Sequence, residues 1–323
     1  MALTILFFIA GIVLVVLGAD WLVDGSVSIA KRSGISEYVI GATIVGIGTS
    51  MPELAVSFFA AIKGNADIAI GNVAGSNMAN TLLILGVTAL ISPIAFTRKN
   101  LRRDIPITLG VSVLLALFAL DTFIWKSEAN KIVRPEAIFL LLCFAAYMWL
   151  NFKQDKDSAG PSCEVPAEAQ EKPMGLFKAI ALIIIGLGML VLGGNLFVNS
   201  GTEIAKALGV SDSLIAISMM AVGTSLPELA TCIVAAAKKN NQLALGNILG
   251  SNISNILLIL GLSGTVVPLN VNPQSFVSLM LLPVSVIVLW MTSFTFRKNT
   301  LDRVDGAILI LLYAAYIVTI GRM

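Results

Sequence analysis

The sequence predicts an all-α integral membrane protein with ten transmembrane helices, arranged as two inverted five-helix repeats. Three observations support this fold class: the composition, ten separate apolar runs, and a long segment that occurs twice. Apolar residues make up 57% of the chain and charged residues only 12%, with a mean hydropathy of +0.92. In soluble domains roughly a quarter of the residues are charged. The composition therefore places this chain in a lipid bilayer.

Each predicted helix is a run of about 17 to 25 mostly uncharged residues, enough to cross about 30 Å of hydrocarbon. The ten runs are 2–22, 38–62, 71–92, 105–123, 135–152, 176–198, 213–237, 244–266, 276–294 and 304–321. The first run has no basic residues before it, unlike the apolar part of a signal peptide, so we expect it to be retained as a helix.

The lysines and arginines of the loops predict how the chain lies in the membrane, because these residues favour the cytoplasmic side. With ten crossings, fifteen of them fall on one side and six on the other. The first side is then cytoplasmic. We expect a multi-pass protein of the inner (plasma) membrane with both termini on the non-cytoplasmic side.

The internal repeat is long and has no gaps. The segment GTSMPELA at 48–55 recurs as GTSLPELA at 223–230, and aligning 48–86 with 223–261 gives 23 identities in 39 positions. We therefore predict a first repeat over 1–152, a cytoplasmic linker over 153–175 and a second repeat over 176–323. Five crossings in each half is an odd number, so the second half enters the membrane from the opposite side. Inverted repeats are typical of secondary transporters, which bind their substrates near the middle of the bilayer.

Two glutamates inside apolar runs, Glu53 and Glu228, need a physical explanation. A charged side chain at the centre of a transmembrane helix costs about 2.5 to 3.5 kcal/mol on insertion scales, and such residues are usually functional. Each glutamate follows a threonine and a serine by four and three residues, so the three side chains share one helix face. The repeated polar residues are Thr49, Ser50, Glu53, Ser76, Asn77 and Asn80, and Thr224, Ser225, Glu228, Ser251, Asn252 and Asn255.

These side chains would surround a cation with oxygen atoms alone. Pro52 and Pro227 add to this set, because a proline lacks the amide proton that would bond the carbonyl four residues earlier. Oxygen ligands in a flexible arrangement suit Ca²⁺ and other hard cations, whereas transition metals favour nitrogen or sulfur. The chain has no histidine, and its three cysteines lack metal-ligand spacing. Two carboxylates would neutralise one divalent ion.

Other roles for the polar and small residues stay open. An intramembrane glutamate can hydrogen-bond between helices, and the glycines of the motifs, Gly71, Gly75, Gly246 and Gly250, can serve close helix packing. Asp20 and Asp24, near the end of the first run, are expected to be interfacial or vestibule groups, with a role in an ion path as the alternative.

The paired motifs GTSMPEL with GSNMANTLLILG and GTSLPEL with GSNISNILLILG resemble the alpha-repeats of the cation/calcium exchanger superfamily, of the prokaryotic sodium/calcium exchanger type. The resemblance covers nearly the whole chain, with the first motif region at 41–86 and the second at 216–261. It implies alternating access to a central site, with the first and sixth helices sliding against the rest. The ligands that it implies are Thr49, Ser50, Glu53, Ser76 and Asn80, Thr224, Ser225, Glu228, Ser251 and Asn255, and backbone carbonyls near Gly46 and Ala221.

One departure concerns Asn80 and Asn255, where some relatives carry an aspartate. Asparagine at both positions leaves two carboxylates in the inner shell, which weakens the case for potassium co-transport and leaves proton coupling through Glu53 and Glu228 open.

The function expected from these observations is an antiporter that exchanges Ca²⁺ against Na⁺. Exchange of Ca²⁺ against H⁺, or of another cation, on the same scaffold is the alternative. We expect no enzyme activity, no cofactor, no nucleic acid and no obligate protein partner, only the transported ions and the lipid bilayer. A membrane enzyme is disfavoured because no base is positioned beside a serine, and a channel because inverted repeats with broken helices are typical of transporters.

Overall fold

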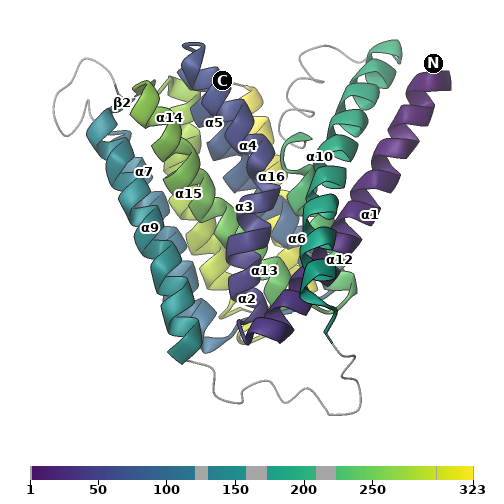
Figure 1. The fold of residues 1–323 in the computed structure, drawn as a ribbon. Coiled ribbons are helices and arrows are strands. Elements are labelled where there is room, and N and C mark those ends of the chain that lie inside the picture. The colour runs from purple at the N-terminus through teal and green to yellow at the C-terminus, as the bar shows by residue number, and fades with distance from the viewer. Residues whose placement is uncertain (1, 121–129, 158–172, 209–222, 296, 323) are drawn as a thin grey trace.

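A computed structural model shows the chain as a bundle of helices (Figure 1). It describes residues 2–120, 130–157, 173–208, 223–295 and 297–322. Within these residues seven helices are long and apolar enough to cross a membrane. Glu37–Thr49 and Met51–Ile62 form an apolar pair bent by 47°, which is an eighth span if the two helices are counted as one. Two predicted runs, 105–123 and 213–237, lie partly outside the described residues, so the count of ten stays a prediction.

The first half consists of long helices interrupted by π-helical turns, which we label η. Its elements are α1 (Ala2–Ser33), α2 (Glu37–Ile40), η1 (Gly41–Val45), α3 (Gly46–Thr49), α4 (Met51–Ile62), α5 (Ala66–Met78), η2 (Ala79–Ile84), α6 (Leu85–Ile91), β1 (Ile94–Ala95), η3 (Asn100–Asp104), α7 (Ile105–Phe118), β2 (Lys131–Ile132) and α9 (Arg134–Asp157). Thus α5, η2 and α6 together form one span, Ala66–Ile91.

The second half follows nearly the same order. Its elements are α10 (Leu176–Ala207), α12 (Leu226–Ala237), α13 (Asn241–Ser254), η5 (Asn255–Leu260), α14 (Gly261–Val266), β3 (Leu269–Asn270), α15 (Pro273–Thr292), β4 (Thr300–Leu301) and α16 (Arg303–Gly321). When the two repeats are aligned without a gap, α12 begins and ends at the positions equivalent to those of α4, and β3 at those of β1.

Helices α1 and α10 pack against each other along a row of regularly spaced glycines. A Cβ on Gly18 would lie 2.8 Å from the Gly186 carbonyl oxygen, and one on Gly193 would lie 2.9 Å from the Gly11 carbonyl oxygen. The two backbones are therefore close enough to exclude any side chain between them. Residues later in α1 contact residues earlier in α10, so the two helices are antiparallel. Figure 1 shows this pair along one side of the bundle.

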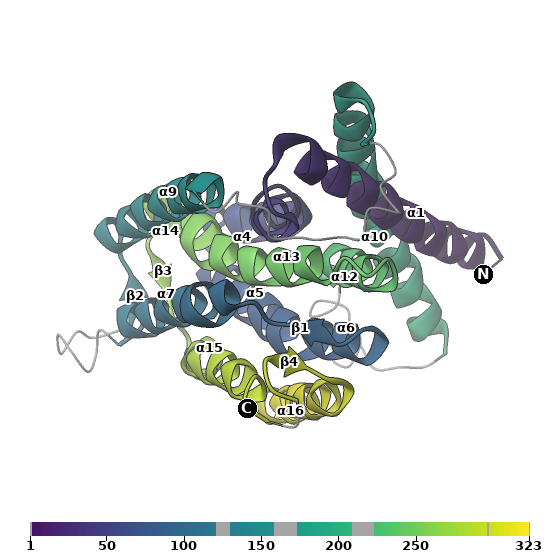
Figure 2. The same cartoon turned by 90° about the horizontal axis from the view of Figure 1, so that it is seen from below.

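The span of α13 and η5 lies in the middle of the bundle, with α1 and α10 on one side and α15 and α16 on the other (Figure 2). Two glycines let the broken first-half span approach it. A Cβ on Gly246 would meet the carbonyl oxygen of Tyr38, and one on Gly250 would meet the backbone of Ala42. Gly246 and Gly250 therefore serve the close helix packing that the sequence left open for them, whereas a Cβ on Gly75 would meet no described atom within 4 Å.

Short antiparallel strand pairs join the two halves outside the helices. Strand β1 pairs with β4, with Ile94 opposite Leu301, and β2 pairs with β3, with Ile132 opposite Leu269. Each pair takes one strand from each half, so the loops of the two halves hold one another in place. All four of these apolar residues are fully buried.

Candidate cation site

Each of the two motifs lies at a break in a helix. The first falls at Ser50, between α3 and α4, where the backbone leaves the helical region (φ −83°, ψ 7°). Ser225, before α12, has nearly the same backbone angles (φ −87°, ψ 8°). Pro52 and Pro227 lie in the first turn of the helices that follow, so their missing amide protons fall at these breaks rather than inside a continuous helix. Each glutamate thus projects from the first turn of a helix.

The two carboxylates are held by serines of the opposite motif. The Ser50 hydroxyl donates to Glu228 Oε1 at 2.9 Å, and the Ser225 hydroxyl donates to Glu53 Oε1 at 3.3 Å. Both glutamates are fully buried. Motifs from the two halves of the chain therefore meet in one polar cluster, as the sequence predicts for Glu53 and Glu228.

Several carboxylate and carboxamide oxygens of the motif residues are buried but have no hydrogen-bond partner within the described protein. One of them, Asn252 Oδ1, has a counterpart, Asn77 Oδ1, that is paired, and Asn80 Nδ2 is unpaired as well. The other four oxygens are Glu53 Oε2, Glu228 Oε2, Asn80 Oδ1 and Asn255 Oδ1. These four form two pairs of equivalent atoms, one from each half of the chain. Leaving a buried acceptor unpaired costs about 1 to 3 kcal/mol, and more for a charged group. Four unpaired acceptors, two of them on carboxylates, fit a cation.

The motif hydroxyls are the next oxygen atoms in the cluster. Thr49 donates to Asn247 Oδ1 at 3.1 Å, and Thr224 donates to Asn72 Oδ1 at 3.3 Å. The Ser76 hydroxyl lies 3.5 Å from that of Thr224. Ser251 donates to the carbonyl oxygen of Gly46 at 3.0 Å, a backbone oxygen that the family resemblance implies as a ligand.

The structure links nine of the twelve predicted site residues through hydrogen bonds: Gly46, Thr49, Ser50, Glu53, Ser76, Thr224, Ser225, Glu228 and Ser251. Asn80 and Asn255 are buried in the π-helical turns η2 and η5, and Ala221 lies outside the described residues. Their role as ion ligands remains a prediction.

Two asparagines that the predicted site leaves out, Asn72 and Asn247, accept from the threonines of the cluster. They occupy equivalent positions of the two repeats, and that duplication inside apolar helices is the signal that points to them. Asn77 and Asn252, which the sequence includes among the repeated polar residues, bond each other: Asn77 donates to the carbonyl oxygen of Asn252 at 3.0 Å, and Asn255 donates to Asn77 Oδ1 at 2.9 Å.

Asp20 and Asp24 form ion pairs rather than joining the cluster. Lys238 Nζ lies 2.7 Å from Asp20 Oδ1 and 2.6 Å from Asp24 Oδ1. All three side chains are partly exposed. They link α1 to the end of α12, which agrees with the interfacial role expected for the aspartates.

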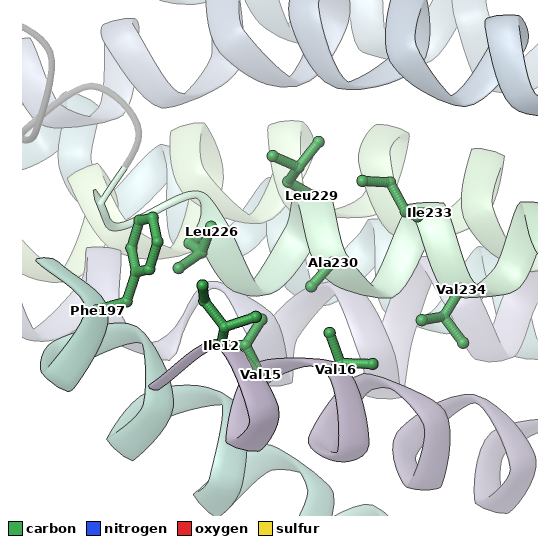
Figure 3. A pocket seen from close by; sticks show the side chains of 9 residues that line it. All are labelled: Ile12, Val15, Val16, Phe197, Leu226, Leu229, Ala230, Ile233 and Val234. Carbon is green, nitrogen blue, oxygen red and sulfur yellow. The ribbon is translucent and has the colours of Figure 1, made fainter. Parts of the chain in front are cut away.

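An apolar cavity of about 260 Å³ separates α1 from α12 beside the cluster. Ile12, Val15 and Val16 line it from α1, and Leu226 and Leu229 are among its lining residues from α12 (Figure 3). Apolar side chains facing each other across a gap make no directional bonds. The described lining of this part of the interface between α1 and α12 is apolar and therefore supplies no polar contact that fixes its register.

The chain is similar to known exchangers along nearly its full length. The model of the family described as sodium/calcium exchanger protein matches residues 3–153 and 178–321. The putative antiporter CaxA of Alkalimonas amylolytica is 35% identical over 318 residues, with 98% of each chain covered. The sodium/calcium exchanger MaX1 of Methanosarcina acetivorans is also 35% identical, with 98% of this chain and 97% of the relative covered.

Solved structures agree with the sequence comparisons. The sodium-calcium exchanger NCX_Mj, soaked with Na⁺ and Sr²⁺, superposes with a TM-score of 0.82 at 31% identity, covering 98% of both chains. The apolar helices, the buried carboxylate pair and these matches lead to one conclusion: the chain is a membrane protein of the sodium/calcium exchanger family.

Proposed function

We propose that this protein is a secondary active antiporter that exchanges Ca²⁺ against Na⁺ by alternating access at one central site. The observation that carries the proposal is the set of four unpaired buried oxygens, on Glu53, Glu228, Asn80 and Asn255. Two carboxylates and two amides, related between the halves, suit a cation better than any neutral substrate.

The surrounding oxygens favour Ca²⁺ among the divalent ions. Ca²⁺ takes six to eight oxygen ligands at about 2.3–2.6 Å in flexible geometry, whereas Mg²⁺ demands a near-ideal octahedron and dehydrates reluctantly. Serine hydroxyls of both motifs contact the carboxylates, and the Gly46 carbonyl oxygen accepts from Ser251. The similarity to MaX1 and NCX_Mj, both named as sodium/calcium exchangers, supports the same pair of ions.

Exchange follows from competition for one charged site. Na⁺ and Ca²⁺ bind the same oxygens and therefore compete. Without a bound cation, the two negative charges of the site oppose the change of access from one side of the membrane to the other. If three Na⁺ exchange for one Ca²⁺, one net charge moves, and a membrane potential contributes about 2.3 kcal/mol per 100 mV. Sodium entry would then drive calcium out of the cell.

For the architecture we propose ten crossings, as two inverted repeats over 1–152 and 176–323 joined by a cytoplasmic linker. The antiparallel packing of α1 on α10, the first helices of the two repeats, supports opposite insertion of the two halves.

The glycine-packed α1 and α10 would move as one body along the apolar interface with α12, which exposes the site to each side in turn. Both chain ends lie at the same end of the bundle (Figure 1), and the lysine and arginine distribution supports the non-cytoplasmic side for that end.

Purified protein in liposomes tests the proposal. Vesicles loaded with Na⁺ and diluted into sodium-free buffer with Ca²⁺ should accumulate Ca²⁺, while vesicles loaded with choline should not. Uptake driven by a proton gradient and indifferent to Na⁺ would establish the proton/calcium alternative instead. A dependence on K⁺ would show potassium co-transport. Calcium entry that only runs down its own gradient would indicate a channel and overturn the proposal.

A further inference from the structure

Two short hydrogen-bond chains run from the backbone to the threonines of the cluster, one from each half of the molecule. Each chain consists of a backbone carbonyl, a hydroxyl or thiol, an asparagine carboxamide and a threonine hydroxyl. The first joins Ala69, Ser57, Asn72 and Thr224, and the second joins Ala244, Cys232, Asn247 and Thr49. When the repeats are aligned, Ala244, Cys232 and Asn247 are equivalent to Ala69, Ser57 and Asn72. Each chain ends at the equivalent threonine of the opposite half of the molecule.

The first chain is made of oxygen and nitrogen atoms throughout. Ser57 Oγ donates to the Ala69 carbonyl oxygen at 3.3 Å and accepts from Asn72 Nδ2 at 2.9 Å. Asn72 Nδ2 also reaches the Glu53 carbonyl oxygen at 3.3 Å. At the far end Asn72 Oδ1 accepts from Thr224 at 3.3 Å.

The second chain has sulfur where the first has oxygen. Cys232 Sγ lies 3.6 Å from the Ala244 carbonyl oxygen and accepts from Asn247 Nδ2 at 3.4 Å. Asn247 Oδ1 then accepts from Thr49 at 3.1 Å, and the Gly46 carbonyl oxygen lies 3.5 Å from the same hydroxyl. Cys232, Asn247 and Thr49 are all buried.

The chemistry of the groups fixes the direction of both chains. A carbonyl oxygen only accepts, so Ser57 or Cys232 uses its hydrogen there and offers only a lone pair to the asparagine. The asparagine must therefore present its NH₂ to that residue and its oxygen to the threonine. The threonine in turn donates its hydrogen to the asparagine. Both lone pairs of each threonine oxygen are then left for other contacts, and on Thr224 the Ser76 hydroxyl, 3.5 Å away, can donate to one of them.

From this direction we infer that Ser57 with Asn72, and Cys232 with Asn247, are positioning residues that keep the lone pairs of Thr224 and Thr49 turned toward the transported cation. The inference rests on the proposed function, since it concerns the same site. It also makes the two half-sites unequal. A thiol is a weaker donor and acceptor than a hydroxyl, so the Cys232 chain holds Thr49 less firmly than the Ser57 chain holds Thr224.

Single substitutions at the start of each chain test the inference without touching a predicted ligand. Ser57→Ala and Cys232→Ala should each raise the KM for Ca²⁺ about twofold to tenfold, the range of one hydrogen bond. The maximal rate should change by less than about twofold. Ser57→Cys and Cys232→Ser keep the chains intact and should stay within about threefold of wild type, with Cys232→Ser at or below the wild-type KM.

A double-mutant cycle separates positioning from a merely structural role, because Ser57 is joined to Thr224, and Cys232 to Thr49, through an asparagine. Calcium binding to purified protein is titrated calorimetrically in Thr224→Val and Thr49→Val backgrounds. The effect of Ser57→Ala should vanish with Thr224→Val and persist with Thr49→Val, and Cys232→Ala should show the reverse. Thermal unfolding and gel filtration of each variant identify any that fail to fold.

The outcomes distinguish this inference from the proposed function. An unchanged KM in both alanine variants, with normal wild-type exchange, would overturn the inference alone. Equal losses in conservative and alanine variants would also overturn it, because they would point to packing. A wild-type protein without sodium-driven calcium flux would instead overturn the proposed function.

Discussion

The hydroxyl of Ser50 donates a 2.9 Å hydrogen bond to the carboxylate of Glu228, which lies 178 residues further along the chain. Ser225 and Glu53 repeat the contact in the other direction at 3.3 Å. Each motif therefore completes the other, and neither half of the chain holds a complete site.

Neutralising either carboxylate should abolish exchange. In Glu53→Gln and Glu228→Gln the site keeps its shape but loses one of two charges. Opposite unit charges about 4 Å apart attract by about 4 kcal/mol in a protein interior, so we expect calcium affinity to fall at least about a hundredfold. Calorimetric titration and liposome flux measure this. Glu203→Gln, at an exposed glutamate of α10, is the matched control and should transport normally. Wild-type flux in either site variant would refute a shared site.

Removing a serine that holds a carboxylate should have a smaller effect of the same kind. In Ser50→Ala, Glu228 loses its 2.9 Å donor, and a hydrogen bond to a charged group is worth about 1.5 to 3 kcal/mol. We expect calcium affinity to fall about tenfold or more. Ser225→Ala should lose less, because its hydrogen bond is 3.3 Å long. Equal affinity in Ser50→Ala and wild type would show that the reciprocal contact does not support binding.

Enlarging a glycine at the central helix contact should destabilise the fold. A methyl group in Gly250→Ala would meet only backbone atoms of Ala42, which cannot turn aside as a side chain would. Overpacking of this kind costs about 1 to 3 kcal/mol, so we expect a lower Tm in detergent. Gly188→Ala is the matched control, because a Cβ there meets no atom within 4 Å. A Tm for Gly250→Ala equal to that of the control would contradict the close contact.

The ion pairs of Lys238 predict a loss of stability in alkaline solution. Partial burial lowers the pKa of this amine, but hydrogen bonds to Asp20 and Asp24 outweigh burial and raise the pKa above its ordinary value of 10.5. The ammonium is thus favoured in the folded state, so its contribution is complete below pH 10.5 and disappears as the pH rises through the raised pKa.

Thermal unfolding between neutral pH and about pH 11 measures this contribution, since that range spans the ordinary titration of lysine. The Tm difference between wild type and Lys238→Met should shrink as the pH rises, while Lys239→Met, the neighbouring lysine, serves as the control. A difference that does not change with pH would show that the ion pairs do not stabilise the contact between α1 and α12.

Most of the site could be predicted from the sequence because the motif is duplicated and chemically unusual. A buried carboxylate is costly in an apolar span, so its recurrence with the same threonine and serine indicates function at both places. The membrane-spanning helices are predicted by the length of the apolar runs, and the two related halves are predicted by the repeat. Asn72 and Asn247 could not be predicted in the same way, because an amide in a transmembrane helix can equally bond a neighbouring helix or a ligand.

The sequence by itself determined the membrane-spanning character, the two related halves and the oxygen chemistry of the cluster, since these depend on composition, run length and spacing along one helix. Only the tertiary structure decided which serine meets which glutamate, that the asparagines connect threonines to Ser57 and Cys232, and that Gly250 lies against Ala42. The physical reason is that hydrogen bonds and close packing depend on distances of a few ångströms between segments that lie in different halves of the chain, which no local pattern encodes.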